Sequence, residues 1–210
     1  MGDEDNKDLI RPRPRNKRVW ADVVSEPKEV TCRLFEEALR RDPKEQRRWV
    51  MLVDGDPRQL ERIEKAKEHF GVDVTVVMDF IHVLEYLWSA SYAFHDPGSK
   101  EAQQWVQERG LRILQGKSSD VAAGMRRSAT LQALNKSKRE AVDKCAGYLL
   151  NNREYLQYDL YLEVGFPIGT GVIEGACRHL VKDRMDLTGA RWRLTGAEAV
   201  LRLRALRASG

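Results

Sequence analysis

The chain has 210 residues, 42% of them apolar and 32% charged, with a formal net charge of +4, so it is long enough for one domain with a buried core. No apolar run approaches the roughly 18 to 20 residues that a membrane-spanning helix needs, so we expect no membrane partner. Residues 1–8 carry four acids and no apolar stretch, which argues against a signal peptide.

The first half of the chain predicts an α/β core. Residues 1–16 are charged and contain Pro12 and Pro14, so we expect a disordered arm. Apolar runs and helical spacing then alternate, which is typical of strands and helices in an α/β sheet. The expected strands are 17–24, 48–53 and 72–78, and the expected helices are 27–41, 57–69 and 79–94. Gly71 is the predicted C-cap of the second helix. Together these elements define a core over residues 17–96.

The second half predicts helices alone. Residues 97–165 show helical periodicity with breaks near 116–119 and near Asn135, which indicates an all-helical segment. Residues 166–210 begin with a glycine-rich loop and contain two further helices, expected at 172–185 and 195–207. Thr195 and Glu198 have the spacing of a capping box at the start of the last helix.

The cysteines and the charge distribution bear on compartment and partner. Cys32, Cys145 and Cys177 are too few and too widely spaced for a disulfide framework or a paired-cysteine zinc site, which favours a reducing cytoplasm. Residues 171–210 hold eight Lys and Arg against four Asp and Glu, a net charge of +4, so the other residues sum to zero. A basic segment of this kind favours a polyanionic partner, although a solvated helix face is an equal interpretation.

Two carboxylates follow neighbouring apolar runs. Asp54 comes directly after the run 48–53, and Asp79 directly after the run 72–78. Ligands of open α/β sheets bind beyond the carboxyl ends of the strands, and Mg²⁺ takes one or two carboxylates with water and phosphate oxygens. The alternative is structural, since Asp79 is also a plausible helix N-cap and Asp54 can cap a turn around Gly55.

Three other features could contribute chemistry. His82 lies three residues after Asp79, so both share a helix face and His82 could bind a phosphate or orient an acid, although a core or capping histidine is the simpler interpretation. Glu174 falls in the first turn of an expected helix, where an acid is ordinary. Arg178, Lys182 and Arg184 give that helix a basic character.

Longer strings of residues resemble a known family. They are VDG at 53–55, DFIHVLEYLW at 79–88, GTGVIEGACRHLVKDR at 169–184 and GARW at 189–192. Together they resemble the C-terminal part of bacterial insertion-sequence transposases of the ISKra group, from about Arg11 to the end of the chain.

The resemblance implies a DDE transposase with a ribonuclease H-like core, interrupted by an all-helical insertion. Asp54 matches the second acid and Glu174 the third, and these would bind Mg²⁺ (or Mn²⁺) for DNA strand cleavage and transfer. Asp79 and His82 match an Asp-x-x-His element. The partners would be transposon and target DNA and a second transposase chain, in the bacterial cytoplasm at the nucleoid. Expected DNA contacts are Arg178, Lys182, Arg184, Arg191 and Arg193.

One part of the family pattern has no counterpart in residues 1–24, namely the strand that carries the first acid. We therefore expect an incomplete core that lacks its first strands and a chain with little activity alone. An alternative is a non-catalytic remnant that binds DNA or dimerises with a full-length transposase. A third is a phosphohydrolase, because Asp54-Gly55-Asp56 superficially resembles the Asp-x-Asp element of haloacid-dehalogenase-like phosphatases.

Overall fold

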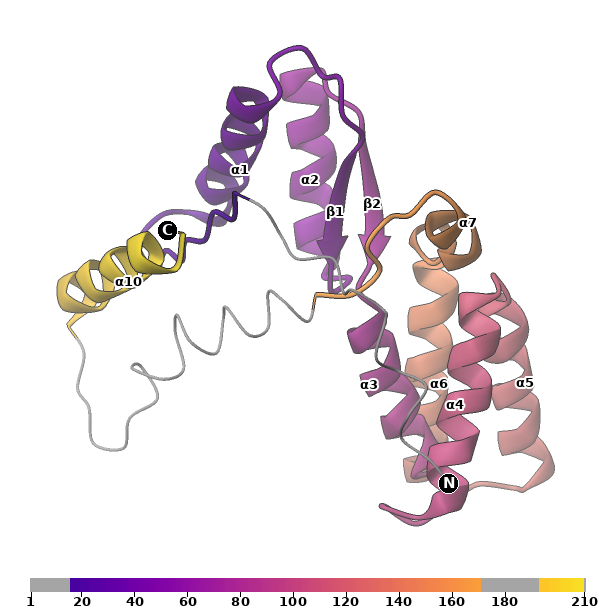
Figure 1. The fold of residues 1–210 in the computed structure, drawn as a ribbon. Coiled ribbons are helices and arrows are strands. Elements are labelled where there is room, and N and C mark those ends of the chain that lie inside the picture. Colours follow the sequence, from indigo (N-terminus) through magenta and orange to yellow (C-terminus); the bar gives the residue numbers. More distant parts are fainter. Residues whose placement is uncertain (1–15, 171–192, 210) are drawn as a thin grey trace, which may run out of the picture. The chain divides into compact units, whose positions relative to one another are not determined.

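The computed structural model describes residues 16–170 and 193–209 (Figure 1). By their contacts these residues form two compact units. The larger comprises residues 27–170, and the smaller comprises residues 16–26 with 193–209. The expected helix over 172–185, and with it Glu174, lies outside the described residues.

The larger unit contains a two-stranded parallel sheet. Strand β1 (Trp49–Val53) pairs with β2 (Val74–Met78) in a register that sets Val53 opposite Met78. The two strands are joined by helix α2 (Pro57–Phe70). Helix α1 (Pro27–Arg41) packs beside α2, and Phe35 stacks on Phe70 with ring centroids 5.7 Å apart. The predicted α/β class is thus confirmed in a mostly helical form.

The ends of α2 follow the predicted chemistry. Asp56 is the N-cap, its side chain accepting the Arg58 N–H, and Pro57 occupies the first turn. Gly71 takes the left-handed conformation with φ 67°, and its N–H donates to the Lys67 carbonyl. The predicted C-cap is therefore confirmed.

The outer edge of β2 is covered by tyrosines from the distant helix α7 (Tyr158–Glu163). The Tyr158 hydroxyl donates to the Met78 carbonyl at 2.7 Å, and the Tyr161 hydroxyl to the Val76 carbonyl at 3.5 Å. Such bonds satisfy backbone groups that a further strand would otherwise occupy.

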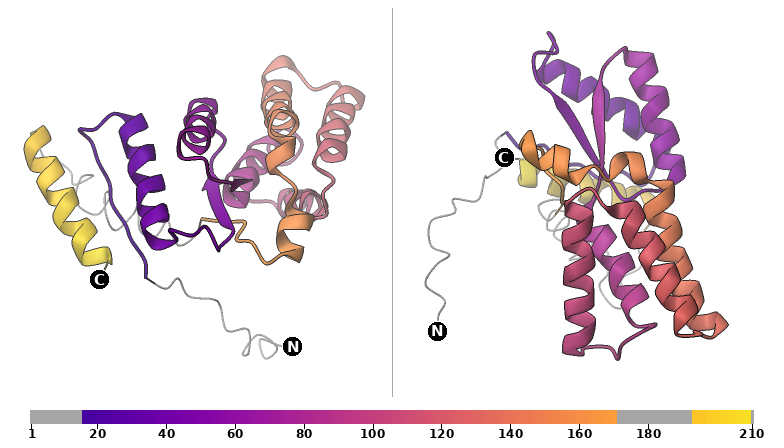
Figure 2. Two further views of the ribbon diagram at one scale, coloured as in Figure 1. Left: turned by 90° about the horizontal axis from the view of Figure 1, so that it is seen from above. Right: turned by 90° about the vertical axis from the view of Figure 1, so that its right-hand side faces the viewer.

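The predicted all-helical segment is confirmed (Figure 2). Helix α3 packs against α4 and α6, and α5 packs against α4 and α6, so the four helices enclose an apolar interior. Asn135 caps the N-terminus of α6, as expected at a helix break. The 3₁₀ turn η1 links α6 to α7. The bounds are α3 Phe80–Ser91, α4 Lys100–Leu114, α5 Ser118–Leu131, α6 Lys136–Asn151 and η1 Arg153–Tyr155.

The predicted strand at 17–24 is wrong, since residues 16–26 form no strand. The main-chain N–H groups of Val19, Val23, Val24 and Ser25 donate to side chains instead of to a neighbouring strand. Asp22 accepts the N–H groups of Val24 and Ser25 in a local turn, and Val19 donates to the Ser209 hydroxyl. The turn and these bonds group this segment with helix α10 (Leu194–Ser209) rather than with the sheet.

The predicted capping box at 195–198 is also wrong. Helix α10 begins at Leu194, so Thr195 already lies inside it. The Glu198 carboxylate is buried and accepts the Val23 N–H at 3.2 Å and the Arg202 Nε at 2.8 Å. The Glu198 carboxylate therefore binds the N–H of the distant Val23 instead of taking part in a cap at the start of its own helix.

No helix in the described ranges has both the length and the apolar character required to cross a membrane.

Candidate functional site

Asp54 and Asp79 lie at the same edge of the sheet. Because Val53 pairs with Met78 in the parallel register, each acid follows directly at the carboxyl end of its strand. The Asp79 N–H also donates to the Val53 carbonyl at 2.7 Å, which continues the ladder by one residue. The sequence-based placement of the two acids at one edge is therefore correct.

Asp79 is buried and fully engaged by the protein. Its side chain is the N-cap of α3 and accepts the Ile81 N–H at 3.0 Å. It also accepts the N–H of Thr170 at 3.2 Å and the Thr170 hydroxyl. The Phe80 N–H donates to the Ile168 carbonyl at 2.8 Å beside it. Asp79 therefore caps α3 and holds the 165–170 loop at the edge of the sheet by hydrogen bonds to Thr170.

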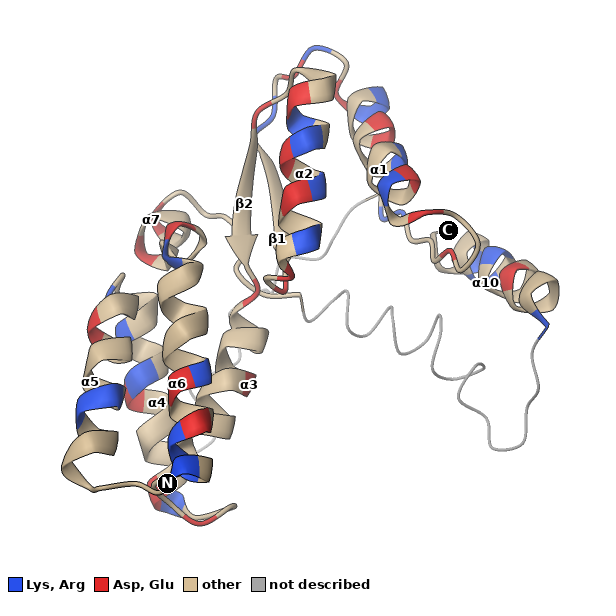
Figure 3. Cartoon of the chain, turned by 180° about the vertical axis from the view of Figure 1, so that it is seen from behind, with Lys and Arg blue, Asp and Glu red and all other residues tan. Residues whose placement is uncertain are grey.

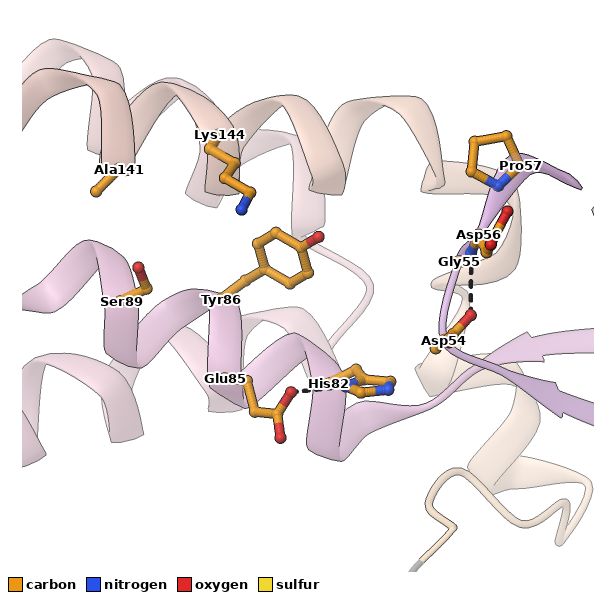
Figure 4. A pocket seen from close by; sticks show the side chains of 10 residues that line it. All are labelled: Asp54, Gly55, Asp56, Pro57, His82, Glu85, Tyr86, Ser89, Ala141 and Lys144. Carbon is orange, nitrogen blue, oxygen red and sulfur yellow. Dashed lines mark hydrogen bonds and ion pairs between the residues drawn. The ribbon is translucent and has the colours of Figure 1, made fainter. Parts of the chain in front are cut away.

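Asp54 is exposed, and the turn that follows it is closely packed (Figure 4). Its Oδ1 accepts the Asp56 N–H at 3.0 Å, which folds the chain into a turn. Gly55 in that turn has φ +92°, and a Cβ there would lie 2.9 Å from the Met78 Sδ and 3.0 Å from the Tyr148 Cε2. Only glycine fits this conformation and this space without strain.

Tyr148 of α6 supports the turn from the helical segment. Its hydroxyl donates to the Asp54 carbonyl at 3.1 Å, and its ring stacks on Tyr86 at 4.0 Å between centroids. Burial, together with the nearby Tyr86 and Asp54, raises the pKa of Tyr148, so the hydroxyl stays a neutral donor. The main-chain position of Asp54 thus depends on a residue 94 positions away.

His82 pairs with Glu85 rather than with Asp79. Its Nδ1 lies 2.7 Å from the Glu85 Oε2, one turn along α3. Partial burial lowers the pKa of His82, but the Glu85 carboxylate, aided by Asp54 and Asp79, outweighs it, so the pKa lies above its ordinary value. The ring therefore carries a positive charge over a wider pH range beside the Asp54 turn.

These side chains line one open groove of about 490 Å³ (Figure 4). The Asp54–Pro57 turn forms one end, and facing side chains of α3 and α6 form the walls. Lys144 points into the groove above Tyr86, its Nζ 5.7 Å from the ring centroid. A carboxylate, an imidazole and an ammonium group together can bind a cation and a phosphate side by side.

Sequence reasoning found Asp54 and His82 but missed the residues that shape the groove. Glu85 had a signal, since it lies three positions after His82 on one helix. No local sequence pattern pointed to Tyr148 or Lys144, because only the packing of α6 against α3 brings them to the strand end.

The remaining predicted site residues are only partly described. Glu174, Arg178, Lys182, Arg184 and Arg191 lie outside the described residues. Arg193 is exposed just before α10, and its carbonyl accepts the Ala197 N–H at 2.9 Å. Within residues 16–170 and 193–209 no group of three His, Cys, Asp or Glu side chains is arranged to hold a metal ion.

Comparisons of the chain with protein-family models, with curated proteins and with solved structures found no match.

Proposed function

We propose that this chain is the C-terminal catalytic part of a DDE transposase with a ribonuclease H-like core. The observation that carries the proposal is the exposed carboxylate of Asp54. It directly follows β1 at the carboxyl edge of a parallel strand pair and opens onto a groove with His82. This is the position that the resemblance assigns to the second acid, and ligands of α/β sheets bind at this edge.

The order of elements supports the same proposal. The helices α4 to α7 follow the strand pair, as an all-helical insertion between the second and third acids requires. After them the chain returns to the sheet edge, where Thr170 is hydrogen-bonded to Asp79. Glu174, the proposed third acid, follows Thr170 by four positions in the sequence.

The donor set fits Mg²⁺ or Mn²⁺. Mg²⁺ binds one or two carboxylates and keeps several waters, so Asp54 and Glu174 together are an adequate protein contribution. A metal bound there would activate the attacking oxygen and stabilise the leaving oxygen of a phosphodiester. His82, whose pKa the Glu85 carboxylate raises, would donate to a phosphate oxygen beside it, and Asp79 would act by holding the 165–170 loop.

Metal binding can be tested without an activity assay. Mn²⁺ bound at Asp54 should broaden the imidazole NMR signals of His82 in the full 210-residue chain. We expect Asp54→Asn to abolish this broadening and Asp56→Asn to leave it intact, because Asn still caps α2. Equal broadening in wild type and Asp54→Asn would contradict the proposed metal site.

The chain alone should show little or no strand transfer, since the first acid of the family pattern has no counterpart in residues 1–24. Magnesium-dependent nicking of plasmid DNA by this chain, abolished by Asp54→Ala, would contradict that expectation. Such a result would at the same time support Asp54 as a catalytic ligand.

A second candidate is a non-catalytic protein that binds DNA or associates with a full-length transposase. It is favoured by the engagement of Asp79 in capping, which leaves Asp54 as the one exposed strand-end acid of the described sheet. DNA binding that weakens with salt and is unchanged by Glu174→Gln, together with no Mn²⁺ effect at His82, would favour this candidate.

The proposed DNA contacts have a direct test. Replacing Arg178, Lys182, Arg184, Arg191 and Arg193 by Gln should weaken duplex binding and flatten its salt dependence. The slope should fall by about one unit for each phosphate that the variant no longer binds.

A further inference from the structure

A second groove lies between α1 and α2 in the larger unit, with a volume of about 690 Å³. Helical spacing explains its composition. Lys28, Thr31 and Cys32 share the face of α1 that meets α2, and Arg58, Arg62 and Ala66 share a face of α2. Ala66 is buried and small, so the floor between the helices stays open. The Phe35–Phe70 stack joins the two helices through their apolar faces.

The groove is strongly basic. Its described lining includes four basic side chains, Lys28, Arg58, Arg62 and Lys65, and one carboxylate, Glu61. Figure 3 shows the basic residues of α2 as blue bands that alternate with red ones along the helix. Glu61 is engaged by Lys65 at 2.6 Å, and that hydrogen bond keeps the pKa of Glu61 below its ordinary value. Lys28, Arg58 and Arg62 therefore set the charge of the groove.

The basic groove adjoins the candidate site. Asp56 and Pro57 line the groove at the strand ends, and Arg58, the next residue, lines the groove between α1 and α2. Arg58, the first basic residue of this groove on α2, thus follows Asp54 by only four positions in the chain.

We propose that the groove between α1 and α2 binds the phosphate backbone of duplex DNA and leads it to the Asp54 edge. Arginine and lysine side chains spaced along a groove suit a repeating phosphate polymer, because each contact releases counterions and adds affinity without reading sequence. Only the path of the DNA toward Asp54 rests on the proposed function. The binding of DNA in the groove depends on the described residues of α1 and α2 alone.

The test compares two triple variants of the full chain by fluorescence anisotropy on a labelled duplex of about 24 base pairs. The groove variant is Lys28→Gln/Arg58→Gln/Arg62→Gln. The control is Arg127→Gln/Lys136→Gln/Lys138→Gln, which removes the same charge from α5 and α6. We expect the groove variant to lose at least about tenfold in affinity near 0.1 M salt and about 3 units of salt slope, and the control to change little.

Cys32 supplies an independent measurement inside the groove. It is partly exposed, whereas burial raises the pKa of the Cys145 thiol to about 12 and keeps it unreactive. Duplex DNA should slow alkylation of Cys32 by N-ethylmaleimide, quantified by mass spectrometry on the peptide that contains Cys32. The protection should disappear in the groove variant and persist in the control.

The outcomes separate this inference from the proposed function. Equal affinity of wild type and groove variant, with weaker binding when the C-terminal cations are replaced, overturns the groove and leaves the proposed DNA contacts standing. Equal losses in both triple variants, or no duplex binding at low salt, also overturn it. Loss confined to the groove variant with Cys32 protection supports it, even if Mn²⁺ has no effect at His82 and the proposed metal site fails.

Discussion

The two strand ends at the carboxyl edge of the sheet differ in what their carboxylates bind. Asp79 is buried, 3% exposed, and all its described partners are groups of the protein itself. Asp54 is exposed, and its described partner is the Asp56 N–H of its own turn. A carboxylate that already holds a helix and a loop has a structural role, whereas an exposed one on a groove can take an external ligand. The difference divides the pair into a structural acid and a candidate ligand.

The largest expected effect tests this division directly. Asp79→Ala removes the cap of α3 and leaves Thr170 without its acceptor, so we expect the free energy of unfolding to fall by about 3 kcal/mol. Asp54→Ala loses one exposed turn bond and should cost less than about 1 kcal/mol. Urea unfolding followed by circular dichroism measures both. Similar losses for the two variants would remove the distinction between the two acids.

The turn at Asp54 should be almost as sensitive as the Asp79 cap. Gly55→Ala forces a Cβ against Met78 and Tyr148 at a positive φ, and we expect it to cost about 2 kcal/mol. Gly124→Ala is the matched control, since Gly124 lies within α5 and a Cβ there meets nothing within 4 Å. The control should raise stability by about 0.5 to 1 kcal/mol. A stable Gly55→Ala variant would show that the turn is not constrained by its surroundings.

Tyr148→Phe tests whether α6 supports the turn at Asp54 through the Tyr148 hydroxyl. The variant keeps the ring stack with Tyr86 but removes the hydroxyl bond to the Asp54 carbonyl, so unfolding should become easier by about 1 kcal/mol. Tyr92→Phe, at an exposed position, should stay within about 0.5 kcal/mol of wild type. If the two variants match, α6 does not support the turn through that hydroxyl.

The smallest expected effect concerns His82. Glu85→Gln removes the charge that raises the pKa of His82, so that pKa should fall, as measured by NMR titration of the imidazole. Because the folded pKa exceeds the unfolded one, the pair stabilises the protein fully below the unfolded pKa of about 6.5, and this gain is lost as pH rises through the folded pKa. The partial exposure of His82 limits the gain to a few tenths of a kcal/mol. An unchanged pKa in Glu85→Gln would assign the shift to Asp54 and Asp79 instead.

Local sequence patterns were enough to predict the two strands, several helix ends and the adjacency of the two strand-end acids. Continuous apolar runs predicted β1 and β2, as is typical of strands in parallel sheets. In β1 only Val53 is fully buried, whereas in β2 every residue except Thr75 is. Proline and glycine marked helix ends through their backbone preferences, and Asn135 through a side chain that accepts the Lys138 N–H within one turn. The adjacency of Asp54 and Asp79 also followed from local sequence, since parallel neighbours end at one edge.

The tertiary structure decided the rest, because the partners are distant in the chain. Residues 17–24 have strand-like composition, but their N–H groups bind Ser209 and Glu198, and no sequence window contains both sides of such a bond. Glu198 does not form the predicted capping box for the same reason, because its carboxylate accepts the N–H of the distant Val23. The roles of the two strand-end acids were likewise set by Thr170 and Tyr148, which approach from 91 and 94 positions away. The sequence by itself determined that two carboxylates end two strands, and long-range packing decided which one is buried in the protein and which one faces the groove.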